Sequence, residues 1–120
     1  IHINKTGALI IAAIKAGLYL GNPSKDMLSN LDIYSENLGL AYQIADDILD
    51  VVSDTATLGK PAGSDAAQGK NTYPALVGLD ESRRLAREQA DAACAALTGF
   101  RGPEAEFLRA LAGYTITRAA

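Results

Sequence analysis

The sequence predicts an all-α protein, and three observations support this prediction. Alanine and leucine dominate the composition, and both residues have high helix propensity. Apolar residues recur at helical spacing, whereas β-branched residues do not form the alternating runs that strands need. Clusters of Gly, Pro and Ser divide the chain into a few long segments. Its 120 residues correspond to about one domain with a modest core.

Local signals place the helices. A first helix over 4–20 is apolar on nearly every side, as in a helix buried in a bundle. Ser24 is a suitable N-cap for the long second helix, and Asp80 is the N-cap candidate of a later one. Pro103 fits the first turn of the last helix. The predicted helices span 4–20, 25–52, 72–78, 80–97 and 103–118, with a long loop over 53–71.

Composition and charge exclude several classes of protein. An apolar share of 48% argues against disorder, and a net charge of −3 argues against a nucleic-acid partner. The most apolar stretch, residues 8–20, is short for a membrane span and contains Lys15. The single cysteine, Cys94, lies in an alanine-rich run, and we interpret it as a buried helical thiol. These features favour a soluble, cytoplasmic protein.

The second helix carries an acidic stripe. At about 100° per residue, Asp50 lies about 40° from Asp46, and Asp47 about 100° from it. Most of the remaining circumference is apolar, so we expect protein to pack around it. Like charges at three- and four-residue spacing repel each other, and no basic residue interleaves here. A bound cation would relieve this repulsion, and oxygen ligands without nearby His or Cys favour Mg²⁺. The alternative is a solvated acidic face.

Basic residues elsewhere would complement a diphosphate bound to such a metal. Lys5 and Thr6 open the first helix, while Lys60 and Lys70 each follow a glycine in the long loop. Lysine is a point-charge partner for phosphate and threonine a hydroxyl donor. Each lysine taken alone could equally be a solvated surface charge. Their combination with the acidic helix is what indicates a diphosphate site.

Four motifs occur in order along the chain: KTGAL at 5–9, QIADDILD at 43–50, LGKP at 58–61 and GKNTYPAL at 69–76. Together they resemble the second half of the polyprenyl synthetase family of trans-polyprenyl diphosphate synthases. The similarity is greatest to the bacterial members that make farnesyl or geranylgeranyl diphosphate. It extends to the end of the chain, where Leu111, Tyr114 and Arg118 are similar to the family's closing helix.

The resemblance implies an all-α helical bundle of the isoprenoid synthase type and a magnesium-dependent prenyltransferase. In such an enzyme an allylic diphosphate ionises, and isopentenyl diphosphate attacks the allylic cation. Metal ions and lysines then stabilise the leaving diphosphate. The resemblance also assigns residues. Metal ligands are Asp46, Asp47 and Asp50; the allylic diphosphate contacts Lys5, Thr6, Gln43, Lys60 and Lys70; and Lys5 and Asp46 are the catalytic residues.

The family's first aspartate motif, its arginine pair and its isopentenyl diphosphate residues have no counterpart in this sequence. The chain also begins without methionine in a segment already patterned as helix. We therefore expect residues 1–120 to be the carboxy-terminal part of one domain whose upstream half is absent, inactive alone and homodimeric when complete. One alternative is a non-catalytic partner subunit of a heteromeric synthase. Another is a terpene cyclase, which is disfavoured because cyclases commonly carry Asn and Ser or Thr in the second motif.

Overall fold

The computed structural model describes residues 5–58 and 71–119, and of residues 5, 6, 18–20 and 54–58 the backbone alone. This described part is helical, and the prediction of an all-α fold is confirmed. The helices are α1 (Lys5–Leu20), α2 (Lys25–Leu58), α4 (Tyr73–Val77), α5 (Leu79–Ala95) and α6 (Pro103–Thr117).

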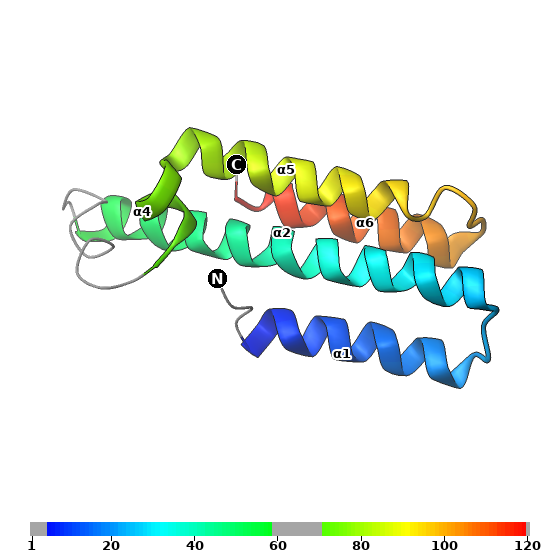
Figure 1. The fold of residues 1–120 in the computed structure, drawn as a ribbon. Helices are drawn as coiled ribbons and strands as arrows, with labels where there is room; N and C mark the ends of the chain where they lie inside the picture. Colours follow the sequence, from blue (N-terminus) through cyan, green and yellow to red (C-terminus); the bar gives the residue numbers. More distant parts are fainter. Residues whose placement is uncertain (1–4, 59–70, 120) are drawn as a thin grey trace.

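Helix α2 is the axis of the structure. Its 34 residues correspond to about 51 Å at 1.5 Å per residue, which matches the 50 Å long dimension of a molecule 21 Å across. It contacts each of the other described helices. Figure 1 shows α1 along one side of α2 and the α5–α6 pair along the other, with α4 near the carboxyl end of α2. Helix α2 is therefore packed between neighbours on two sides.

Two apolar clusters fill the space between α2 and the α5–α6 pair. The first is centred on Tyr34 and Leu38 of α2 and packs against Leu97 and Ala112. The second is centred on Ile44 and Ile48 and packs against the residues of α5, α6 and its carboxyl end. Burying a side chain of this size stabilises a fold by about 1.5–3 kcal/mol. The second cluster fixes which face of α2 turns inward in the acidic segment.

The helix boundaries follow from local chemistry, with two corrections. As predicted, Ser24 caps α2, since its Oγ accepts a hydrogen bond from the Met27 N–H at 3.3 Å. The predicted end of this helix at residue 52 is wrong, because α2 continues to Leu58. Polar residues there suggested a loop, but Gly and Pro are absent before Gly59. The predicted N-cap Asp80 is also wrong, since Gly78 occupies that position.

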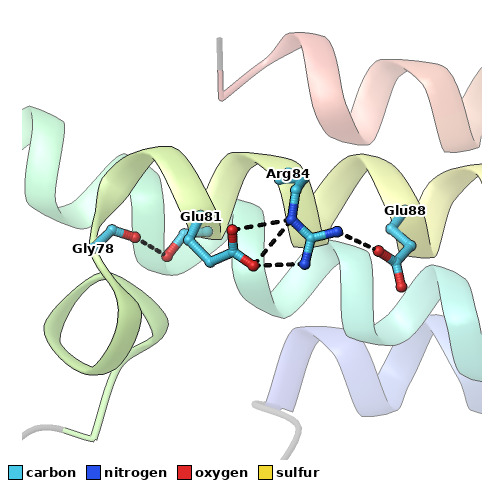
Figure 2. Close-up of polar contacts among 5 residues, drawn as sticks. Gly78, Glu81, Arg84 and Glu88 are labelled. Carbon is cyan, nitrogen blue, oxygen red and sulfur yellow. Dashed lines mark hydrogen bonds and ion pairs between the residues drawn. The ribbon is translucent and has the colours of Figure 1, made fainter.

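Gly78 separates α4 from α5. Its φ of 89° lies in the region that side-chain-bearing residues rarely adopt, so the chain can turn sharply between the two helices. Its carbonyl oxygen accepts a hydrogen bond from the Ser82 hydroxyl at 2.6 Å. One turn further on, the Arg84 guanidinium bridges Glu81 and Glu88 on the exposed face of α5 (Figure 2). These contacts stabilise the first turns of α5, whose Leu79, Leu85 and Ala86 pack against α2 in the second apolar cluster.

The side chains of α1 are less enclosed than predicted. Among those described, Gly7 is buried, whereas Leu9 is 70% exposed and most others are exposed or half-buried. Figure 1 shows the reason, because α1 lies at the edge of the bundle beside α2. The apolar pattern predicted a helix buried in a bundle, and the described side chains of α1 are not enclosed in this way. Within residues 5–58 and 71–119, none of the helices combines the length and apolarity that a membrane crossing requires.

Candidate metal site on the acidic helix

The acidic segment of α2 has an inner and an outer face. Ile44, Ala45 and Ile48 are buried in the second apolar cluster. Asp46 is half-buried and Asp50 is exposed, so the carboxylates face away from that cluster toward accessible space. The wide apolar arc predicted for this helix is confirmed. Two carboxylates one turn apart on a rigid, well-packed helix are positioned for joint binding of one ligand.

Asp47 differs from the other two acids, because its side chain is only 7% exposed. Its Oδ1 accepts a hydrogen bond from Gln43 Nε2 at 2.9 Å, and its Oδ2 accepts one from the Tyr73 N–H at 3.1 Å. The first contact lies within α2, whereas the second ties α2 to the first residue of α4. A buried carboxylate needs such donors, since burial without them costs several kcal/mol. Asp47 therefore links the acidic helix to the segment that follows the loop.

The same contact affects Tyr73 itself. Burial raises the pKa of the Tyr73 hydroxyl above its ordinary value, and the negative charge of Asp47 raises it further. Both causes disfavour a negative charge on the Tyr73 hydroxyl beside the carboxylate of Asp47. Tyr73 is thus held as a neutral phenol beside the acidic helix, and it adds no charge to the candidate site.

The remaining predicted site residues are described only in part. Gln43 is buried and contacts Asp47, so the structure brings together two residues predicted to belong to one site. Lys5 and Thr6 form the first turn of α1, which packs against α2, and the structure describes their backbone only. Lys60 and Lys70 lie outside the described residues.

The donor set of the site fits Mg²⁺. In the described ranges, His, Cys, Asp and Glu side chains form no group of three placed to enclose a metal ion. Mg²⁺ does not need such an enclosure, since it binds through one or two carboxylates and keeps waters or substrate phosphates as its other ligands. Asp46 and Asp50 provide two accessible carboxylates one turn apart. Zinc would favour His or Cys ligands.

Sequence reasoning missed one residue beside this site. The guanidinium carbon of Arg118 lies 4.2 Å from the centre of the Tyr42 ring, one helical turn before Asp46. From the sequence alone, Arg118 is placed only in the closing helix, and Tyr42 has no assigned role. No local signal connects the two, because they are 76 residues apart.

A separate hollow of about 280 Å³ lies among α2, α5 and α6. Apolar residues of the three helices and arginines of α5 line it: Ile48, Arg83, Arg84, Ala86, Arg87, Ile116 and Ala119. None of the residues predicted to bind metal or diphosphate is among them. Ile48 of α2 lines this hollow. The candidate site therefore lies on the opposite side of α2, which carries Asp46 and Asp50.

Comparison with known proteins supplies the family. The family model described as polyprenyl synthetase matches residues 1–100. The farnesyl diphosphate synthase of Escherichia coli is 50% identical over 121 residues, covering 98% of this chain and 40% of the relative. Geranylgeranyl pyrophosphate synthase 11, chloroplastic, of Arabidopsis thaliana is 42% identical over 118 residues, covering 98% of this chain and 33% of the relative. The chain thus spans about a third to two fifths of the length of these relatives.

Proposed function

Because this chain belongs to the polyprenyl synthetase family, we propose that it forms one wall of the active site of a prenyltransferase. The reaction is condensation of isopentenyl diphosphate with an allylic diphosphate to a short-chain trans-polyprenyl diphosphate, farnesyl or geranylgeranyl. The relatives named as farnesyl and geranylgeranyl synthases support this product class. The observation that carries the proposal is the pair of acids Asp46 and Asp50, which are half-buried and exposed, on a helical segment whose opposite face is buried in the second apolar cluster.

In this proposal Asp46, Asp47 and Asp50 hold Mg²⁺, which when bound neutralises the charge of the leaving diphosphate. Asp46 and Asp50 offer accessible oxygens. Asp47 accepts hydrogen bonds from Gln43 and from the Tyr73 N–H, so this member of the acidic motif also anchors α4. The firm anchoring of Asp47 supports a rigid site, since preplaced charges act on a transition state without reorganisation.

The allylic diphosphate is proposed to contact Lys5, Thr6, Gln43, Lys60 and Lys70. Among them, Lys5 acts with Asp46 as a catalytic residue, because its ammonium group would stabilise the diphosphate as the allylic carbon–oxygen bond breaks. The packing of α1 against α2 supports this assignment, since it brings the helix that begins at Lys5 alongside the acidic helix. Gln43 is placed to orient Asp47 as well.

The proposal gives this chain one wall of the site only. We propose that residues 1–120 are the carboxy-terminal part of a single domain in a longer protein, which is cytoplasmic and a homodimer. The second aspartate-rich wall and the isopentenyl diphosphate residues would come from the upstream half. The 120-residue chain alone should then lack activity, and measurable prenyl transfer by the purified chain would contradict this part of the proposal.

An assay of the full-length protein tests the function. The protein is incubated with isopentenyl diphosphate and allylic diphosphates of graded length, and the products are identified by chromatography. We expect Mg²⁺-dependent formation of farnesyl or geranylgeranyl diphosphate. The alternative, a non-catalytic partner subunit of a heteromeric synthase, predicts no product until a second, different chain is added. The intact acidic motif favours the enzyme, because a non-catalytic subunit has no need of these carboxylates.

A further inference from the structure

The structure places a cation from the last helix against the acidic helix. Arg118 is the C-cap residue of α6, and its guanidinium stacks on the Tyr42 ring of α2, 4.2 Å from the ring centre. Its Nη2 also donates a long hydrogen bond of 3.4 Å to the Tyr42 carbonyl oxygen. Arginine suits this position because its planar group can stack and donate simultaneously. The guanidinium of Arg118 therefore contacts both the side chain and the backbone of Tyr42.

The backbone contact leads directly to Asp46. In an α-helix the carbonyl of residue i accepts the N–H of residue i+4, so the Tyr42 carbonyl is the helical partner of the Asp46 N–H. Arg118 thus donates to the oxygen that holds the backbone of Asp46. The Tyr42 side chain also lies about 40° from Asp46 around the helix. A change at Arg118 would accordingly be transmitted to Asp46 through a single carbonyl group and one helical turn.

Arg118 is held there at a cost. Its Nε is buried and has no hydrogen-bond partner among the groups that the structure describes. An unsatisfied buried donor is unfavourable, more so when it belongs to a charged group. A side chain serving only to fill space between α6 and α2 would avoid this cost with an apolar residue. The stack and the unsatisfied donor together favour a role that needs a positive charge beside this turn.

We infer that Arg118 is a positioning residue for the metal-binding carboxylates, acting on Asp46 through Tyr42. It fixes the turn of α2 that carries Asp46, so that the carboxylate is oriented before the metal binds. This inference rests on the proposed function, because it assumes that Asp46 holds Mg²⁺. Supporting groups of this kind typically change metal affinity or activity by about 10- to 100-fold when they are removed.

The test is a Mg²⁺ titration of the full-length protein with two readouts, the rate of prenyl transfer and the rise in melting temperature that Mg²⁺ binding causes. We expect Arg118→Ala to raise the half-saturating Mg²⁺ concentration about tenfold. Arg118→Lys keeps the charge but loses the planar stack, so about a threefold rise is expected. Arg109→Ala is the matched control, because this arginine of α6 contacts the carbonyls of Leu97 and Phe100 instead. It should lower the melting temperature without moving the Mg²⁺ midpoint.

The outcomes separate the inference from the proposed function. An unchanged Mg²⁺ midpoint in Arg118→Ala would overturn the inference. If the alanine variant does not fold, an unchanged midpoint in Arg118→Lys would overturn it. If Asp46→Asn also leaves the midpoint unchanged, the proposed metal assignment is itself wrong. A double-mutant cycle tests whether Arg118 acts through Tyr42. Once Tyr42→Leu has removed the ring, Arg118→Ala should have little further effect on the Mg²⁺ midpoint. Fully additive effects would contradict action through Tyr42.

Discussion

The backbone N–H of Tyr73 donates a hydrogen bond of 3.1 Å to the carboxylate of Asp47, 26 residues earlier in the chain. This contact joins the acidic helix α2 to α4, which follows the undescribed segment 59–70. Asp47 is thereby both a member of the acidic motif and the anchor of the next helix. The two roles can be separated by mutation, because the neighbouring acid Asp50 has no comparable burial.

Replacing Asp47 should reduce stability. Asp47→Ala removes the acceptor of the half-buried Tyr73 N–H and of one Gln43 hydrogen bond, and the loss of a partner by a buried donor costs about 1–3 kcal/mol. Urea unfolding measures the change in the free energy of unfolding. Asp50→Ala is the control, since an exposed substitution is expected to stay within about 0.5 kcal/mol. Equal losses in both variants would contradict the anchoring role of Asp47.

The cap of α4 should matter to the same region. The Thr72 hydroxyl accepts a hydrogen bond from the Ala75 N–H at 3.3 Å, and loss of such a cap costs about 0.5–2 kcal/mol. Thr72→Ala should therefore speed hydrogen exchange at Ala75 and Tyr73, whereas Thr72→Ser, which keeps the hydroxyl, should not. Faster exchange in both variants would mean that the hydroxyl is not what holds this helix.

Tyr34 should make stability sensitive to alkaline pH. Its hydroxyl donates to the Leu108 carbonyl at 2.7 Å, and burial, followed by the charge of Cys94, raises its pKa well above the ordinary 10.0. Since the folded state favours the neutral phenol, the stabilisation is complete below pH 10 and is lost as pH rises beyond it. Tyr34→Phe should cost about 0.5–1.5 kcal/mol at neutral pH.

Unfolding curves at about pH 8 and pH 11 test this linkage. The wild-type protein should lose more stability over this interval than Tyr34→Phe does, because the variant has no phenol to ionise at this position. An identical loss of stability in the two proteins would show that Tyr34 has the same pKa in the folded and unfolded states.

The contacts of Arg84 with Glu81 and Glu88 on the surface of α5 should shift the pKa of Glu81 without a large effect on stability. Hydrogen bonds from Arg84 lower the pKa of Glu81 below its ordinary value, and Figure 2 shows Arg84 between Glu81 and Glu88. The contribution of Glu81 is therefore present above its unfolded pKa and is lost as pH falls through the folded pKa. Arg84→Met should return the Glu81 pKa toward its ordinary value in an NMR titration. An unmoved pKa would contradict the cause assigned here.

Much of the fold could be predicted because its signals are local. Ser24 and Pro103 mark the starts of helices through their own backbone and capping chemistry, and the apolar arc of α2 matches its buried face. The prediction failed over residues 53–58, where polar composition suggested a loop. Helix propagation continued there because neither Gly nor Pro interrupts it.

The acidic residues of the candidate site can be recognised in the sequence, whereas their contacts with other helices cannot. The acidic stripe of Asp46, Asp47 and Asp50 is visible from helical spacing alone. The separate role of Asp47 depends on the Tyr73 N–H, and the Arg118–Tyr42 stack depends on the docking of α6. Both contacts join residues far apart in the chain. Periodicity reports which face a residue occupies on its own helix, and it carries no information about the partner across the interface.

We propose that the acidic helix binds the metal that prenyl transfer requires. A Mg²⁺ titration of prenyl transfer by the full-length protein, comparing Asp46→Asn with Asp32→Asn, tests it most directly. Asp32 is the matched control, because it is an exposed acid of the same helix whose only described ion pair is with Lys15 at 3.9 Å. We predict that Asp46→Asn loses at least about 100-fold in turnover at fixed Mg²⁺, whereas Asp32→Asn behaves as wild type. Unchanged turnover and Mg²⁺ dependence in Asp46→Asn would contradict metal binding by the acidic helix.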